Sequence, residues 1–336
     1  NSGPDVQGEL GVNVGIVMLV HTALGRAEQV ARHWSAAGCP VVIHVDKVVD
    51  RKTYDSFVTA LSDLEHVTFS KRYRCEWGTW GIVQATQAAA ERMLAEYAQV
   101  RHVYLASGSC LPLRPVKDLQ EYLEKRPRTD FIESATTADV PWTQGGLDFE
   151  RFTLRFPFSW RKHRGLFDGF VSLQRKLGFK RQIPDGLVPH MGSQWWCLRR
   201  KTVEAILDFC RERPDVMRFF KTTWIPDETF FQTLVRHLVP AREIDSRTLT
   251  FKMFSDYGMP VTFYNDHYDL LLGQDALFAR KISPEAYELK ERLGDLFVSG
   301  RRDFVISDEG RNLYGFLTGR GRVGRRFGMR FWERES

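Results

Sequence analysis

VGIVMLV, residues Val14–Val20, is a continuous apolar run near the start of the chain. Such a run predicts a strand that is buried on both faces of a parallel sheet, because helices cover both sides of that kind of sheet. A helical pattern follows at Ala27–Ala37, and a second apolar stretch, Val41–Val45, comes next. These three segments begin a β-α-β order.

The same alternation continues through the first half of the chain. Its further segments are predicted helices at Arg51–Leu61 and Thr79–Tyr97 and predicted strands at His66–Phe69 and His102–Ala106. This repeated order predicts an α/β fold with a mostly parallel, doubly wound sheet flanked by helices. The second half is mixed. The segments predicted there are a strand end at Phe131–Glu133, a strand at Gln194–Leu198, a helix at Lys201–Glu212, and a helix at Asp227–His237 with Pro226 at its first position.

The length of 336 residues is enough for one large α/β domain with a sizeable core. No internal repeat or low-complexity linker interrupts the chain before its basic end. We therefore expect a linker at residues 1–12, one domain at 13–298 and a basic C-terminal extension at 299–336. Thr318–Arg334, in that extension, carries six arginines against one glutamate.

The cysteines and the lack of targeting signals indicate in which cellular compartment the protein is expected. The five cysteines are widely spaced and include no Cys-x-x-Cys pair, which favours a reduced compartment and predicts neither a disulfide framework nor a zinc site. The sequence has no apolar run of about 18 residues, and Asn1–Asn13 lacks the plan of a signal peptide. These features predict a cytoplasmic protein.

The net charge of +6 favours polyanionic partners such as nucleic acid, anionic lipid or nucleotide phosphates. The Arg/Gly-rich tail is expected to dock an adjoining domain of a larger chain or an anionic membrane surface. A nucleic-acid-binding role for the tail is the alternative, and it requires steep salt dependence.

Three phosphate- or metal-binding motifs are absent from the sequence. The segment after the first strand lacks a Gly-x-Gly-x-x-Gly fingerprint, which argues against an NAD site. The sequence also contains no Gly-x-x-x-x-Gly-Lys-Ser/Thr loop, which argues against a P-loop enzyme. The turn Ser107–Cys110 follows the strand His102–Ala106, where many nucleotide-sugar transferases hold a metal with Asp-x-Asp, and it contains no carboxylate. If a diphosphate binds, cations such as Arg247, Arg280 and Lys281 must carry its charge.

Polar residues follow several predicted strands. His21, Asp46 and the turn Ser107–Cys110 should converge, because ligands of such sheets bind outside the carboxyl ends of the strands. Asp46 occupies a position suited to a ribose or a base, or else it forms a turn beside Lys47. Trp77 precedes a helix and either stacks on a base or sugar or belongs to the core.

An acidic pair follows Pro226. Glu228 is the candidate general base, because a sugar hydroxyl is a poor nucleophile until a base removes its proton. The alternative is structural, since acids in the first turn of a helix gain about 0.3–1 kcal/mol from the macrodipole. Burial beside Trp195 and Trp196 would raise the pKa of this carboxyl toward its working range.

Together these stretches resemble the family-14 glycosyltransferases, which include core-2 and I-branching β-1,6-N-acetylglucosaminyltransferases and protein O-xylosyltransferases. The resemblance covers about residues 13–295. Its motifs are Val14–Val45 with its end His44-Val45-Asp46, Trp77-Gly78-Thr79-Trp80, Leu105–Leu113, Gly192-Ser193-Gln194-Trp195-Trp196, Pro226-Asp227-Glu228 and Leu277–Lys281.

The resemblance implies a GT-A fold, a UDP-sugar donor, inversion at the anomeric carbon and no metal. It implies Glu228 as the base, Lys281 as the lysine that holds the donor diphosphate, and Arg247 as its arginine partner. It also implies Asp46 and Trp77 near the uridine, with a tyrosine usual where Trp77 stands, and Glu133 and Arg151 at the acceptor. We further expect His21 on the donor side and Trp195 and Asp227 on the acceptor side.

The chain also departs from the family pattern. The luminal disulfides and the membrane anchor of the animal enzymes are not evident, and the interval from Arg247 to Lys281 is longer, through Gly258–Tyr268. We therefore expect a bacterial, cytoplasmic relative. Its expected activity moves N-acetylglucosamine from a UDP-sugar to a hydroxyl of a glycan. The alternatives are a UDP-xylose-dependent O-xylosyltransferase and a non-catalytic nucleotide- or glycan-binding module.

Overall fold

The computed structural model describes residues 13–113, 116–136, 149–252, 262–272, 278–282, 286 and 288–289. The expected linker at 1–12 and the expected C-terminal extension at 299–336 lie outside these ranges. The five cysteines are all free.

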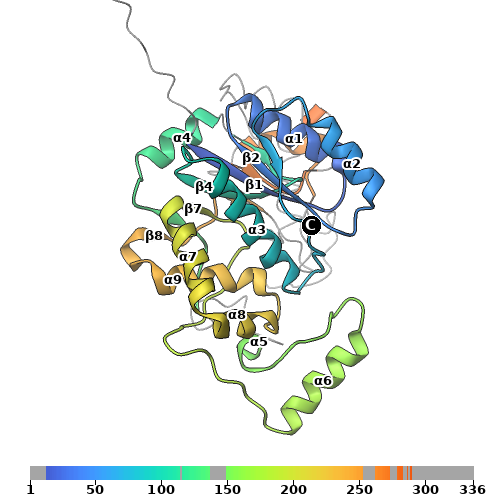
Figure 1. Ribbon diagram of the computed structural model, residues 1–336, viewed down its shortest axis with the longest axis vertical. Helices are drawn as coiled ribbons and strands as arrows, with labels where there is room; N and C mark the ends of the chain where they lie inside the picture. The colour runs from blue at the N-terminus through green and yellow to red at the C-terminus, as the bar shows by residue number, and fades with distance from the viewer. Residues whose placement is uncertain are drawn as a thin grey trace, which may run out of the picture.

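A seven-stranded sheet with the order β3-β2-β1-β4-β7-β6-β8 forms the centre of the molecule (Figure 1). Its strands are β1 (Val14–Val20), β2 (Val41–Val45), β3 (Val67–Phe69), β4 (His102–Ser107), β6 (Asp130–Phe131), β7 (Cys197–Arg199) and β8 (Ile244–Asp245). β7 runs antiparallel to its neighbours β4 and β6, and the other paired strands are parallel. The predicted α/β fold with a mostly parallel sheet is therefore confirmed.

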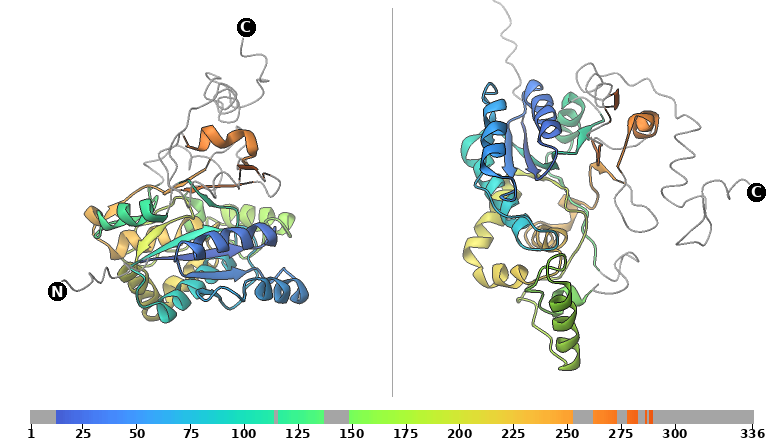
Figure 2. Two further views of the ribbon diagram at one scale, coloured as in Figure 1. Left: turned by 90° about the horizontal axis from the view of Figure 1, so that it is seen from above. Right: turned by 90° about the vertical axis from the view of Figure 1, so that its right-hand side faces the viewer.

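Helices cover both faces of this sheet (Figure 2). One face packs against α1 (Leu24–Ala36), α2 (Arg51–Ala60) and α4 (Val116–Glu124), and the other against α3 (Gly81–Glu96), α7 (Arg200–Glu212), α8 (Pro214–Lys221) and α9 (Phe230–Leu238). Side chains alternate along β1, so that Ile16 and Met18 enter one core and Val17 the other. A strand buried on both faces must be apolar throughout, which explains the opening run.

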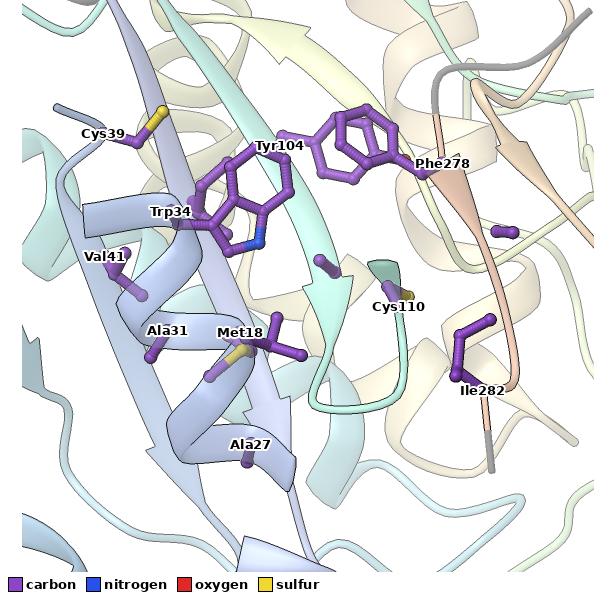
Figure 3. Close-up of a cluster of buried hydrophobic side chains, with 14 of the residues drawn as sticks. Met18, Ala27, Ala31, Trp34, Cys39, Val41, Tyr104, Cys110, Phe278 and Ile282 are labelled. Atoms are coloured by element: carbon purple, nitrogen blue, oxygen red, sulfur yellow. The ribbon is translucent and has the colours of Figure 1, made fainter. Parts of the chain in front are cut away.

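A second, three-stranded sheet brings a late segment onto the first half of the fold. It consists of β5 (Leu111–Pro112), β10 (Phe278–Ala279) and β9 (Thr250–Phe251), in that order, and α10 (Tyr268–Leu272) lies near it. Phe278 packs on Tyr104 of β4 with ring centroids 4.3 Å apart and on Trp34 of α1 at 5.1 Å (Figure 3). This packing places the residues that follow β10 beside the end of β4.

An excursion between residues 149 and 186 projects from the sheet (Figure 1). It contains α5 (Glu150–Thr153) and α6 (Arg164–Lys176). Short 3-10 turns occur at Pro226–Glu228, Ala241–Glu243 and Asn265–His267. None of the helices in the described ranges has the length and apolar character required to cross a bilayer.

Two predicted elements are wrong in detail. The helix predicted at Asp227–His237 is a 3-10 turn, Pro226–Glu228, followed by α9 from Phe230, because the non-helical backbone of Thr229 (φ −132°) separates them. The strand predicted at Gln194–Leu198 is limited to Cys197–Arg199. The backbone before it turns instead, with the Trp195 N–H donating to Ser193 Oγ at 3.3 Å.

Candidate active site

The acidic turn, Pro226–Glu228, lies just before α9 and is closed by its own backbone. The Glu228 N–H donates to the Ile225 carbonyl at 3.1 Å. Asp227 is only 7% exposed, and its Oδ1 has no hydrogen-bond partner within the described ranges. Burial, followed by the charge of Glu228, raises the pKa of Asp227 to about 7. Near neutral pH this carboxyl therefore holds a proton for a large part of the time.

Glu228 stands beside a cation and remains accessible. Its Oε2 accepts a hydrogen bond from Arg151 Nη1 at 3.4 Å, and 37% of its side chain is exposed. Burial raises the pKa of Glu228, the charges of Arg151 and Lys252 lower it, and Glu133 raises it further. A raised pKa makes this carboxylate a stronger base, which suits proton abstraction near neutral pH.

Gly192 joins two of the acids through the backbone. Its N–H donates to the Glu228 carbonyl at 2.9 Å. A β-carbon at Gly192 would lie 1.8 Å from the Glu133 carbonyl oxygen, so no other residue fits without moving the backbone. The structure therefore brings the predicted acceptor residue Glu133 and the predicted base Glu228 to the same place.

The cationic segment, Arg280–Ile282, lies on the other side of the site. Arg280 places its guanidinium 4.4 Å from the ring centroid of the buried Trp195, and its Nε has no partner in the described part of the chain. Burial lowers the pKa of Lys281, and the neighbouring charges of Arg280, Arg161 and Arg26 lower it further. Crowded cations of this kind favour a polyanionic ligand.

Arg26 of α1 holds the cationic segment against the turn after β4. Its Nε donates to the Gly108 carbonyl at 3.0 Å and its Nη1 to the Ile282 carbonyl at 2.6 Å. The Ile282 N–H donates to the Ser109 carbonyl at 3.0 Å. Figure 3 shows Cys110 and Ile282 on these adjacent segments. Two cations thus dock where the sequence lacks an Asp-x-Asp motif.

Among the predicted donor-side residues, His21 lies near both Asp46 and Lys281. Partial burial lowers the pKa of His21, Asp46 raises it, and Lys281 lowers it. The two carboxylate oxygens of Asp46 accept hydrogen bonds from the Val48 N–H at 2.8 Å and the Cys75 N–H at 3.2 Å. Asp46 therefore forms the turn after β2, beside His21.

Trp77 lies at the rim of the site with one face toward a cation. Its ring meets Trp160 and Trp224 edge-on, with centroids 6.0 and 5.2 Å away, and Arg161 lies 5.2 Å from its centroid. Arg161 also acts on Lys281, so Trp77 belongs to the same neighbourhood.

Arg247 lies elsewhere. Its Nε donates to Asp245 Oδ2 at 2.9 Å, and its guanidinium lies 5.5 Å from the Tyr122 ring centroid, beside the edge strand β8. The structure does not group it with Lys281, whose cationic neighbours are Arg280, Arg161 and Arg26.

Sequence reasoning missed Arg26, Arg161 and Lys252 as members of the site. A weak signal existed for Arg26, which follows the first strand by a few residues. The other two are surface-type cations in irregular sequence, and only the fold reveals their position. Within the described ranges, no three His, Cys, Asp or Glu side chains are grouped closely enough to hold a metal ion.

Comparison with known proteins assigns the family. The sequence model described as Core-2/I-Branching enzyme matches residues 18–264. The chain belongs to this family. The Core-2/I-branching family indicates a glycosyltransferase, which acts on a sugar donor and an acceptor, and the acidic turn lies within the matched residues. A family of unknown function (DUF5928) matches residues 280–336 of this glycosyltransferase.

No curated protein matches the chain. Among solved structures, the UDP-glucose pyrophosphorylase of Leishmania major is 11% identical, with a TM-score of 0.34, and the match covers 74% of this chain and 68% of that one. A UDP-glucose phosphorylase from Trypanosoma brucei is 8% identical, with a TM-score of 0.27, and the match covers 58% of this chain and 50% of that one.

Proposed function

We propose that this Core-2/I-branching family member is an inverting, metal-independent glycosyltransferase. It moves a sugar, N-acetylglucosamine in our proposal, from a UDP-sugar to a hydroxyl of a glycan. The observation that carries the proposal is a carboxyl of raised pKa, Glu228, together with the half-buried cations of the Arg280–Ile282 segment; Glu228 and Arg280 both lie near Lys252. The first suits a proton acceptor and the second a departing diphosphate.

The reaction is a single displacement. The acceptor oxygen forms a bond to the anomeric carbon, the bond from that carbon to the diphosphate oxygen breaks, and UDP leaves from the opposite face with the bonding electrons. The hydroxyl proton passes to Glu228. Arg151 pairs with the carboxylate of Glu228 and so limits how far burial raises its pKa.

The leaving group acquires negative charge as its bond to the sugar breaks. Lys281 and Arg280 stabilise this charge, because cations fixed in advance act strongly where water is excluded. Burial lowers the pKa values of both cations, which means that it disfavours their charged forms. An anion bound beside them stabilises those charged forms. Arg247 is replaced in this role by Arg280, since Arg247 pairs with Asp245.

The remaining residues bind the two substrates. His21, Asp46 and Trp77 contact the nucleotide of the donor, and the lowered pKa of His21 favours its neutral form. Glu133, Arg151 and Asp227 bind the acceptor beside Glu228. In our proposal Trp195 also lines the acceptor side, and its ring contacts Arg280 of the cationic segment.

Release of UDP tests the proposal directly. A panel of UDP-sugars, with UDP-N-acetylglucosamine and UDP-xylose among them, is incubated with a mixture of glycan acceptors, with and without EDTA. We expect UDP release with UDP-N-acetylglucosamine that EDTA leaves unchanged. Loss of release in EDTA would contradict the cationic mechanism, and preference for UDP-xylose would correct the sugar. Tight UDP binding without turnover of any donor would instead indicate a non-catalytic module.

A further inference from the structure

The helix α6 presents an apolar stripe to solvent. Leu166, Leu173 and Leu177 are spaced by seven and four residues, so they lie on one side of a helix with about 3.6 residues per turn. All three are exposed, and Leu177, at the end of the helix, is 73% exposed. Phe170, one turn after Leu166, continues the stripe and meets Phe158 edge-on. Exposed leucines in register on a projecting helix are unusual for a surface that faces only water.

Packing of α6 does not account for this stripe. The helix is anchored through a different side, on which Phe167, Val171 and Gln174 are buried. Gln174 fixes the anchor by accepting from the Arg155 N–H and donating to the Arg155 carbonyl, both at 2.8 Å. The leucine side therefore stays outside while the buried side holds the helix rigidly.

The sequence around the stripe is basic. Residues 155–181 contain eight arginines and lysines against a single acid, Asp168. Lys176 and Lys180 are exposed and form no ion pair within the described ranges. Figures 1 and 2 show α6 projecting away from the sheet, where a flat surface can reach it. An amphipathic helix with leucines on one side and lysines beside them is the pattern of a helix that lies in a membrane interface.

We propose that the leucine stripe of α6 docks the protein on an anionic lipid bilayer. The leucines enter the boundary between headgroups and acyl chains, and Lys176 and Lys180 contact the acidic headgroups. This surface is distinct from the candidate active site and does not depend on the proposed function.

Vesicle co-sedimentation of the full chain tests the docking surface. We expect binding to vesicles of phosphatidylcholine with phosphatidylglycerol, little binding to phosphatidylcholine alone, and weaker binding at high salt. Leu173→Glu combined with Leu177→Glu should lower the apparent affinity by at least about tenfold, because two leucines that enter the bilayer are lost and two acids are added. Lys176→Glu with Lys180→Glu should remove the preference for the acidic lipid.

Val48→Glu is the matched control. Val48 is 59% exposed, which is similar to the stripe residue Leu166 at 58%, but it follows β2 and lies outside α6. This variant should sediment like the unchanged chain. All variants are checked by circular dichroism and gel filtration. Binding that survives the double leucine substitution would overturn the proposal and assign the contact to another basic segment such as residues 299–336. A change of oligomeric state in the leucine variants without vesicles would also overturn it, by making the stripe an interface between copies.

Discussion

The acidic turn Pro226–Glu228 and the cationic segment Arg280–Ile282 are fixed by different kinds of contact. The acidic turn is closed mainly by neighbours in sequence. The Glu228 N–H donates a hydrogen bond to the Ile225 carbonyl, and the Thr229 N–H donates to the Pro226 carbonyl. The cationic segment is held from far away, since Arg26 lies 256 residues before its partner Ile282. One half of the site is therefore local, and the other exists only after the sheet has formed.

Burial removes water from the charged groups of both halves, and it shifts the pKa values of the acids and of the cations in opposite directions. Burial raises the pKa of Asp227 and Glu228 and lowers the pKa of Arg280 and Lys281. Each shift disfavours the charged form of its group. A bound anion offsets this cost on the cationic side, and a proton taken up by the carboxylate offsets it on the acidic side. Substitutions in the two halves should therefore have effects that experiments can tell apart.

The largest effect is expected on the acidic side. Glu228→Gln removes the proton acceptor but keeps the size of the side chain, so turnover should fall by about 10²- to 10⁴-fold. UDP affinity should stay close to that of the unchanged enzyme. Kinetics of UDP release and calorimetry with UDP measure the two quantities, and Glu212→Gln, an exposed acid, serves as control. Normal turnover in Glu228→Gln would end the assignment of the base.

The cationic side should show the reverse pattern. Lys281→Ala removes a charged partner of the diphosphate and should weaken UDP binding by about tenfold to a hundredfold. Arg247→Ala should leave UDP affinity unchanged, because its guanidinium pairs with Asp245. Calorimetry with UDP compares the two variants. A strong loss in Arg247→Ala together with none in Lys281→Ala would reverse our placement of the phosphate site.

Asp227→Asn probes burial on the acidic side through stability. In the folded protein the pKa of Asp227 is raised to about 7 from 3.8. Between these values the unfolded chain releases a proton that the folded chain keeps, so rising pH destabilises the unchanged protein through this group. The variant lacks the group and should gain stability relative to the unchanged chain, by about 1 kcal/mol or more at pH 8. Below pH 4 the gain should vanish.

Urea denaturation at pH 4, 6 and 8 follows that difference. The expected gain increases from the lowest pH to about pH 7 and is then constant. A gain that is equal at all three values would mean that the carboxyl of Asp227 is not perturbed by burial.

The smallest effect is expected at the tether. Arg26→Met keeps the side-chain stem but removes both donors to Gly108 and Ile282, and should weaken UDP binding by about threefold. Amide hydrogen exchange should become faster at residues 280–282. Arg32→Met, on the same helix but paired with Asp63 and Glu28, is the matched control. If Arg26→Met has the same UDP affinity and the same amide exchange as the unchanged chain, the position of the Arg280–Ile282 segment does not depend on Arg26.

Much of the fold could be predicted from the sequence because its signals are local. The apolar run Val14–Val20 and the strands at Val41–Val45 and His102–Ala106 are buried by helices on both sides, and burial requires apolar residues in sequence. The 3-10 turn before α9 could not be predicted. A proline followed by acids starts a helix equally well, and the backbone of Thr229 decided the outcome.

Three features could be read from the chain because each depends on residues close in sequence: the mostly parallel sheet, the acidic pair at Asp227 and Glu228, and the lack of a carboxylate after β4. Which cations join the site depends on the three-dimensional fold. Arg26, Lys252 and Arg280 reach it from separate elements, and Arg247 does not. The physical reason is that a charge acts through distance in space, which β-strand pairing and core packing set and which sequence separation does not reveal.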